Sequence, residues 1–140
     1  MVSPVSSDDG RHRILVVEDD TANRLFFTDY LTFSGFNVMA VPHGLDLNSQ
    51  LKEFRPHLLL LDLGLPEIDG YTLIEQVRSS AMWHQLPILV VSGYAFAEDE
   101  RRALALGAQR YLIKPVQLQQ LTKAIYAVLQ QPDAQMPPSP

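Results

Sequence analysis

The sequence predicts a doubly wound α/β fold, with a five-stranded parallel sheet and five helices. Short apolar runs rich in Val, Ile and Leu alternate along the chain with segments that have helical spacing. Continuous apolar runs of this kind are typical of parallel strands that are covered on both faces. At 140 residues the chain is also long enough to bury a substantial core in one domain.

Five apolar runs are assigned to strands. They are residues 14–17 (ILVV), 36–41 (FNVMAV), 58–61 (LLLL), 88–91 (ILVV) and 111–113 (YLI). Periodicity alone does not distinguish a run of four apolar residues from part of a buried helix. Their shortness, their β-branched content and the helical segments between them favour strands.

Apolar residues at helical spacing predict a helix after each strand. The predicted apolar faces are Ala22, Leu25, Phe26, Tyr30 and Phe33; Leu47, Leu51 and Phe54; Leu73, Ile74 and Val77; and Leu118, Leu121, Ile125, Val128 and Leu129. The fourth helix, residues 98–106, begins with acidic residues and ends before Gly107, a residue that often follows a helix. Asp20 is expected to cap the first helix.

Composition limits the domain organisation and the class of protein. Residues 1–11 and the Pro-rich residues 131–140 are expected to be flexible tails around one domain at residues 12–130. A net charge of -5 and a pI near 5.2 argue against direct nucleic-acid binding. No cysteine is present, no apolar stretch reaches membrane-spanning length, and the start of the chain does not look like a signal peptide. We therefore expect a soluble, cytoplasmic protein without membrane contacts.

Polar residues follow four of the five predicted strands. They are Glu18, Asp19 and Asp20 after the first strand, Asp62 after the third, Ser92 after the fourth and Lys114 after the fifth. In open α/β sheets ligands bind outside the carboxyl ends of the strands, so these side chains should converge on one edge. A carboxylate such as Asp62, placed directly after four leucines, is costly to bury without a partner. Its position therefore indicates a site.

The residue types at this edge favour phosphoryl chemistry. Clustered carboxylates repel one another unless a cation lies among them, and oxygen ligands without His or Cys suit Mg2+ or Mn2+. An Asp can form an aspartyl phosphate, and Lys114 and the Ser92 hydroxyl could contact phosphoryl oxygens. The prediction is a metal-assisted site with Asp62 as the phosphoryl acceptor.

Four stretches, in order and spacing, resemble the receiver domain of two-component response regulators. They are "ILVVEDD", "LLLLDLGLPEIDGYTL", "PILVVSG" and "GAQRYLIKPV", within residues 12–130. The resemblance implies a flavodoxin-like sheet with strand order 2-1-3-4-5. It also implies a signalling module, not an enzyme, that accepts a phosphoryl group from a phosphohistidine of a sensor histidine kinase or phosphotransfer protein in a Mg2+-dependent step.

The resemblance also implies roles for the residues that match the family's motifs. Asp62 becomes the phosphoacceptor, and Lys114 contacts the phosphate. Asp19 and Asp62 become direct Mg2+ ligands together with the backbone carbonyl of Gly64, while Glu18 holds the ion mainly through water.

The resemblance to receiver domains also implies a conformational switch. Ser92 is the hydroxyl that moves toward the phosphoryl group, Tyr111 is the aromatic residue that turns inward, and the bond from Lys114 to Pro115 is expected to be cis. Phosphorylation would then remodel the face formed by the fourth helix, fifth strand and fifth helix. That face would serve a downstream protein partner or a homodimer.

Two positions bear on the lifetime of the acyl phosphate in the family. Gly64 has no side chain to position water, and Tyr94 could shield the site. We therefore expect a lifetime longer than that of the shortest-lived members.

Three other functions compete with this interpretation. An aspartyl-nucleophile phosphatase needs an Asp where Gly64 stands, and a nucleotide- or flavin-binding domain needs a Gly-rich turn where the chain has "EDDT". A receiver-like interaction module that works without phosphorylation stays open as an alternative. So does the choice between a stand-alone regulator and the receiver of a hybrid kinase.

Overall fold

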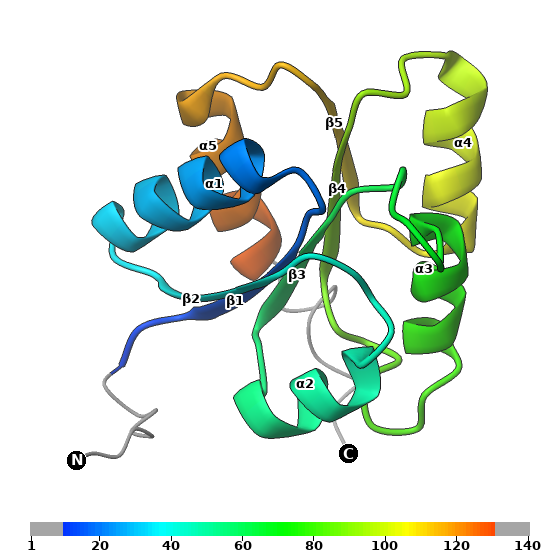
Figure 1. Ribbon diagram of the computed structural model, residues 1–140, viewed down its shortest axis with the longest axis horizontal. Helices are drawn as coiled ribbons and strands as arrows, with labels where there is room; N and C mark the ends of the chain where they lie inside the picture. Colours follow the sequence, from blue (N-terminus) through cyan, green and yellow to red (C-terminus); the bar gives the residue numbers. More distant parts are fainter. Residues whose placement is uncertain (1–9, 131–140) are drawn as a thin grey trace.

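Five parallel strands form one sheet in the order β2-β1-β3-β4-β5 in the computed structural model, which describes residues 10–130 (Figure 1). The strands are β1 (Arg13–Val17), β2 (Asn37–Val41), β3 (Leu58–Leu61), β4 (Ile88–Ser92) and β5 (Arg110–Ile113). Val17 pairs with Leu61, and Leu61 pairs with Val90, so the carboxyl ends of the central strands lie level with one another. The predicted fold class and strand order are confirmed.

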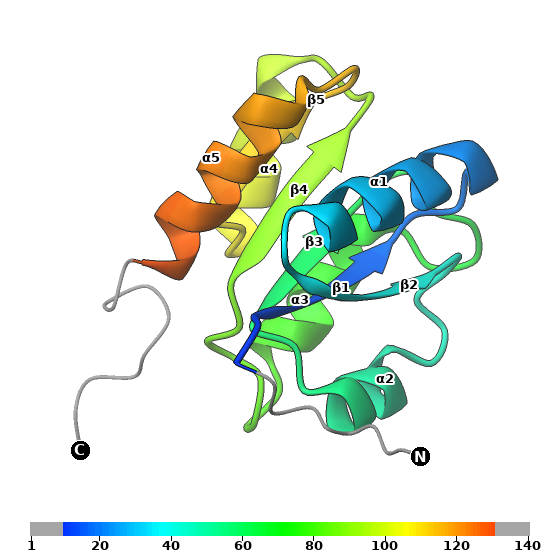
Figure 2. The same ribbon diagram turned by 90° about the vertical axis from the view of Figure 1, so that its left-hand side faces the viewer.

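Helices cover both faces of the sheet (Figures 1 and 2). They are α1 (Thr21–Phe33), α2 (Leu47–Phe54), α3 (Gly70–Arg78), α4 (Ala97–Leu106) and α5 (Leu118–Leu129). One core joins buried residues of α2, α3 and α4 to the sheet, and a second core joins α1 and α5 to the opposite face. The molecule is therefore a three-layer sandwich.

The four leucines of β3 supply both cores. Leu59 and Leu61 belong to the core under α2 and α3, whereas Leu58 and Leu60 belong to the core under α1 and α5. All four are at most 2% exposed. Successive side chains of a strand point to opposite faces, so a central strand with helices on both sides needs an unbroken apolar run.

The predicted apolar face of α1 is wrong. Phe27 and Leu31 are the residues buried against the sheet, whereas Phe26 is 48% exposed and Phe33 is 89% exposed. Leu25 is also exposed. The helix carries two apolar stripes. The spacing of its apolar residues does not reveal which stripe faces the sheet, because that depends on how the connection from β1 orients the helix. Of the predicted apolar face only Tyr30 packs against the core, and the other four residues are exposed.

Other local expectations agree with the structure. Asp20 caps α1, since its carboxylate accepts a hydrogen bond of 2.9 Å from the backbone N–H of Asn23. Gly107 follows α4 with a φ of 122°, a conformation that favours glycine. No helix within residues 10–130 is long and apolar enough to cross a membrane. The predicted tails fall largely on residues 1–9 and 131–140, which lie outside the described residues, and the predicted boundaries of the domain stay a prediction.

Candidate functional site

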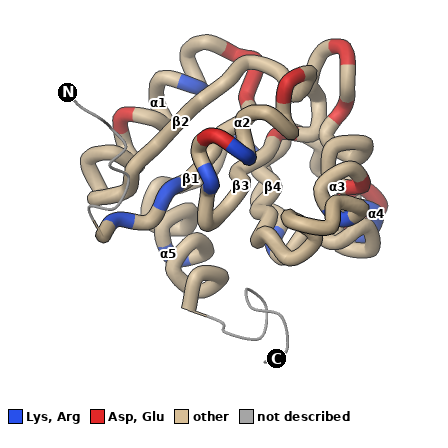
Figure 3. Tube along the Cα trace, turned by 90° about the horizontal axis from the view of Figure 1, so that it is seen from below, with Lys and Arg blue, Asp and Glu red and all other residues tan. Residues whose placement is uncertain are grey.

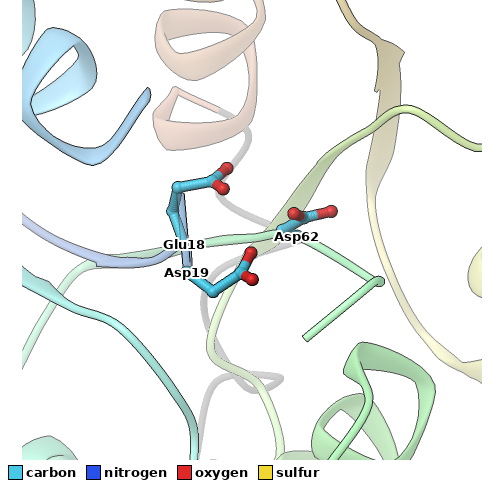
Figure 4. Close-up of side chains that lie close together, drawn as sticks. All are labelled: Glu18, Asp19 and Asp62. Carbon is cyan, nitrogen blue, oxygen red and sulfur yellow. The ribbon is translucent and has the colours of Figure 1, made fainter. Parts of the chain in front are cut away.

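Three carboxylates meet at the carboxyl ends of β1 and β3. The backbone N–H groups of Glu18 and Asp62 still donate to neighbouring strands, to the carbonyls of Val41 and Val17, which holds both residues in the extended direction of the sheet. Carboxylate oxygens of Glu18, Asp19 and Asp62 lie within 4.8 Å of one another (Figure 4). Glu18 is 2% exposed and Asp62 is 7% exposed, whereas Asp19 faces solvent.

Lys114 completes the cluster from the end of β5. Its Nζ lies 2.8 Å from Oε1 of Glu18 and 3.2 Å from Oδ2 of Asp62. Its backbone N–H donates to the carbonyl of Ser92 in β4, and the peptide bond from Lys114 to Pro115 is cis, as expected. The ammonium is thereby directed across the sheet edge toward the carboxylates.

Burial and charge shift the pKa values in this cluster. Burial raises the pKa of Glu18, although hydrogen bonds from Lys114 and from the backbone N–H of Asp20 oppose that shift. Burial acts to lower the pKa of Lys114, but its hydrogen bond to Glu18 and the charges of Asp62 and Glu18 outweigh burial and raise it. Two adjacent carboxylates thus hold the amine in its charged form.

The donor set fits a hard divalent cation. Three carboxylates and one ammonium leave the cluster with an excess of negative charge, and two of the carboxylates are buried. Such a cluster is costly unless a further cation shares it. All the side-chain ligands offered are carboxylate oxygens, which suits Mg2+.

The loop after β4 is tied to two side chains that the sequence selected. Ser92 is fully buried at the end of β4, and its Oγ accepts a hydrogen bond of 3.1 Å from the N–H of Tyr94. The hydroxyl of half-buried Tyr111 donates to the carbonyl of Tyr94 at 2.8 Å. Both predicted switch residues therefore contact the backbone of one residue, Tyr94.

The side chain of Tyr94 lies over Gly64. A Cβ at position 64 would stand 3.1 Å from the Tyr94 hydroxyl oxygen. The N–H of Gly64 also donates to Oδ1 of Asp62 at 3.3 Å, so this covered residue contacts the central carboxylate directly. The Tyr94 hydroxyl therefore lies beside the residue whose N–H contacts Asp62, and shielding of the site by Tyr94 stays a prediction.

Gly70 has a role that the sequence did not reveal. Its place after Asp69 reads as turn chemistry, and Asp69 does cap α3 through the N–H of Thr72. Gly70 itself is the first residue of α3, and a Cβ there would lie only 2.5 Å from the carbonyl oxygen of Asp62. The absence of a side chain lets α3 begin directly against the strand end that carries Asp62.

Two further features were missed in the sequence. The guanidinium of Arg24 donates to the carbonyls of Glu18 and Asp19 at 3.0 and 3.2 Å, and so holds the turn after β1. A hollow of about 370 Å³ also opens beside Lys114, between the start of α1 and the β5–α5 connection, and Phe26 and Pro115 line it. For Arg24, the sequence offered only one indication of this role, its position one turn into the first predicted helix.

The structure brings the four predicted charged residues Glu18, Asp19, Asp62 and Lys114 into one cluster. The ligand role of the Gly64 carbonyl, the movement of Ser92 and the inward turn of Tyr111 stay predictions.

Comparison with known proteins places the chain among signalling domains. The family model described as the response regulator receiver domain matches residues 14–126. The polar-differentiation response regulator DivK of Brucella anthropi is 28% identical over 116 residues, which cover 83% of this chain and 94% of the relative.

Solved structures agree with that match. A CheY-like response regulator receiver domain protein from Methanospirillum hungatei is 29% identical with a TM-score of 0.80, covering 87% of this chain and 96% of that one. The receiver domain of sensor histidine kinase PA1611 from Pseudomonas aeruginosa is 26% identical with a TM-score of 0.78. The match covers 86% of this chain and 98% of that one.

Proposed function

The chain belongs to the response regulator receiver domain family of two-component signalling, and on that premise we propose that Asp62 accepts a phosphoryl group from a phosphohistidine. The donor is a sensor histidine kinase or a histidine phosphotransfer protein. The protein acts as a signalling module that assists its own phosphorylation. A domain at residues 12–130 and a cytoplasmic location are parts of this proposal.

The observation that carries the proposal is the contact of Asp62 with Lys114 inside an acidic cluster. An oxygen of Asp62 attacks phosphorus, the bond from phosphorus to the donor imidazole nitrogen breaks, and that nitrogen keeps the electron pair and takes up a proton. Lys114, 3.2 Å from Asp62, is close enough to contact the incoming phosphoryl oxygens after a small movement of its flexible side chain. Its raised pKa keeps the ammonium charged at neutral pH.

Mg2+ is the cofactor that we assign to the cluster. The receiver domain of PA1611 has a magnesium ion coordinated in its active-site cleft. Here Asp19, Asp62 and the carbonyl of Gly64 would bind the ion, with Glu18 acting mainly through water, and Mn2+ could replace it. When bound, the ion neutralises charge that develops on the phosphoryl oxygens.

Phosphorylation would be read through the loop after β4. Ser92 would exchange its hydrogen bond from the Tyr94 N–H for one to the phosphoryl group, and Tyr111 would leave the Tyr94 carbonyl and turn inward. Both changes act on the loop that leads into α4, so the face of α4, β5 and α5 would shift between two populated states. Leu104 and Ile113 are exposed apolar residues in α4 and β5 that a downstream protein or a second copy could cover.

The first experiment is intact-protein mass spectrometry after incubation with acetyl phosphate, with and without Mg2+. We expect a single Mg2+-dependent phosphoryl adduct that is absent in Asp62→Asn. If no adduct forms and a beryllium fluoride complex also fails to bind, the proposal is rejected in favour of an interaction module that works without phosphorylation.

A further inference from the structure

Two adjoining hollows lie at the end of the sheet opposite to Asp62. The first, of about 330 Å³, is lined by His12 before β1, His57 before β3, the connection from α3 to β4, and Leu129 at the end of α5. The second, of about 510 Å³, lies between α2 and α3. Both are lined by Met82 and Trp83, so they meet across these two side chains. We call the pair the base groove.

The first hollow of the base groove is lined mainly by apolar and aromatic side chains, whereas in the second hollow Met82 and Trp83 are joined by polar side chains such as Asn48, Gln76 and Ser79. Trp83 is half-buried, with the guanidinium carbon of Arg55 5.8 Å from the centre of its ring, and Met82 is 61% exposed. None of the described residues that line the two hollows is acidic, and Lys52 lines the second. Figure 3, which views this end of the molecule, shows Lys and Arg positions at the start of β1 and around α2, with an acidic position between those of α2. An occupant should therefore combine apolar groups with a negative charge.

Proline-rich segments fit such a surface well. Aromatic-lined grooves bind proline-rich chains because these are already extended and lose little conformational entropy on docking. Residues 131–140, QPDAQMPPSP, contain four prolines, one methionine, one aspartate and no basic residue. Residues 1–9 are also acidic but contain a single proline.

The point at which residues 131–140 join the fold, and the length of this segment, also favour it as the occupant. Residue 131 follows two positions after Leu129, which lines the first hollow. Ten residues in an extended proline-rich conformation span about 31 Å. Tethering also gives an effective concentration in the millimolar range, so a weak contact is sufficient.

We propose that residues 131–140 dock in the base groove and cover Trp83. The groove lies at the opposite end of the sheet from the acidic cluster, so this inference does not depend on the phosphorylation of Asp62.

Trp83 is the single tryptophan of the chain, and its fluorescence therefore reports on the groove alone. The test compares acrylamide quenching of the full chain with that of the full-length triple variant Met136→Ser, Pro137→Ser and Pro138→Ser. We expect the quenching constant to rise roughly twofold in the variant, because a tethered millimolar contact is largely occupied in the parent. The matched control carries Val2→Ser, Pro4→Ser and Val5→Ser, and it should quench like the parent.

A second pair of variants locates the contact. Met82→Glu places a negative charge in both hollows, so the triple substitution should change quenching no further in that background. Equal quenching of the parent and the triple variant would overturn the proposal. So would a rise in the Val2, Pro4 and Val5 control, which would assign the groove to the other end of the chain, or quenching that depends on protein concentration, which would assign it to a second copy.

Discussion

Lys114 lies closer to Glu18 than to the proposed phosphoacceptor. Its Nζ is 2.8 Å from Oε1 of Glu18 and 3.2 Å from Oδ2 of Asp62. Because Glu18 is only 2% exposed, the ammonium is the main compensation for a buried charge as well as a candidate phosphate ligand.

Removal of the Lys114 charge should therefore destabilise the fold through Glu18. We expect Lys114→Ala to lower the free energy of unfolding in Mg2+-free buffer by about 1–3 kcal/mol, below the range for fully buried pairs because Lys114 is partly solvated. Urea unfolding measures the change. The double variant Lys114→Ala with Glu18→Gln should regain much of the loss, since the uncompensated charge is gone. Equal stability of the two variants would contradict this coupling.

Mg2+ should stabilise the folded chain through Asp19. At a concentration tenfold above its Kd, the ion adds about 1.4 kcal/mol to the free energy of unfolding by mass action. Asp19→Asn should remove most of that gain without disturbing the ion pairs of Lys114, because Asp19 is exposed and lies outside those pairs. The experiment is urea unfolding with and without Mg2+.

Asp20→Asn is the matched control for that measurement. Asp20 is the next residue and carries the same charge, but its carboxylate caps α1, a role that Asn also performs. Its Mg2+ gain should equal that of the parent. If both variants lose the Mg2+-dependent gain in stability equally, the ion acts through the net negative charge at this edge of the sheet and not through the carboxylate cluster.

Tyr94 should lengthen the lifetime of the aspartyl phosphate. Its hydroxyl oxygen would lie 3.1 Å from a Cβ at position 64, beside the residue whose N–H donates to Asp62, and we expect it to hinder the approach of water. We expect Tyr94→Ala to shorten the dephosphorylation half-time in Mg2+ buffer roughly fivefold, which corresponds to about 1 kcal/mol of barrier. Phe96→Ala is the control, because Phe96 belongs to the same loop and is 79% exposed. An unchanged half-time in Tyr94→Ala would exclude shielding.

The sequence was sufficient for the charged cluster because of topology. Strand ends in a parallel sheet share one edge, so any polar residue that directly follows an apolar run is placed there without knowledge of side-chain packing. Asp62 after the four leucines and Lys114 after residues 111–113 are examples, and the structure brings them within 3.2 Å.

The sequence could not reveal features that depend on how a helix is rotated about its axis or on how closely two backbone segments approach each other. The apolar face of α1 was assigned wrongly because Phe26 and Phe27 are neighbours with opposite environments, and only the packed helix shows which one faces the sheet. The need for Gly70 comes from its distance to the carbonyl oxygen of Asp62, and a turn signal does not carry that information.

Gly70 provides a direct test of that close approach. We expect Gly70→Ala to lower the free energy of unfolding by about 3 kcal/mol, since the new methyl group would overlap the backbone of Asp62 and Leu63, where no flexible side chain can yield. Gly93→Ala is the control, because a Cβ there meets nothing within 4 Å. Urea unfolding of the two variants should separate them clearly, and equal stability would show that α3 can shift without cost.

The exposed stripe of α1 should serve the phosphoryl donor. Phe26 is 48% exposed and lines the hollow beside Lys114, so a protein that delivers a phosphohistidine to Asp62 would bury it. We expect Phe26→Ala to lower kcat/KM for transfer from the cognate kinase roughly five- to thirtyfold, as loss of an interface residue worth about 1–2 kcal/mol does. The rate with acetyl phosphate should stay unchanged, because a small donor needs no docking surface.

Phe33→Ala is the matched control, since Phe33 is an exposed phenylalanine two turns further along the same helix and does not line the hollow. Equal losses in both variants would place the contact along the whole stripe, and no loss in either would place the donor on another face.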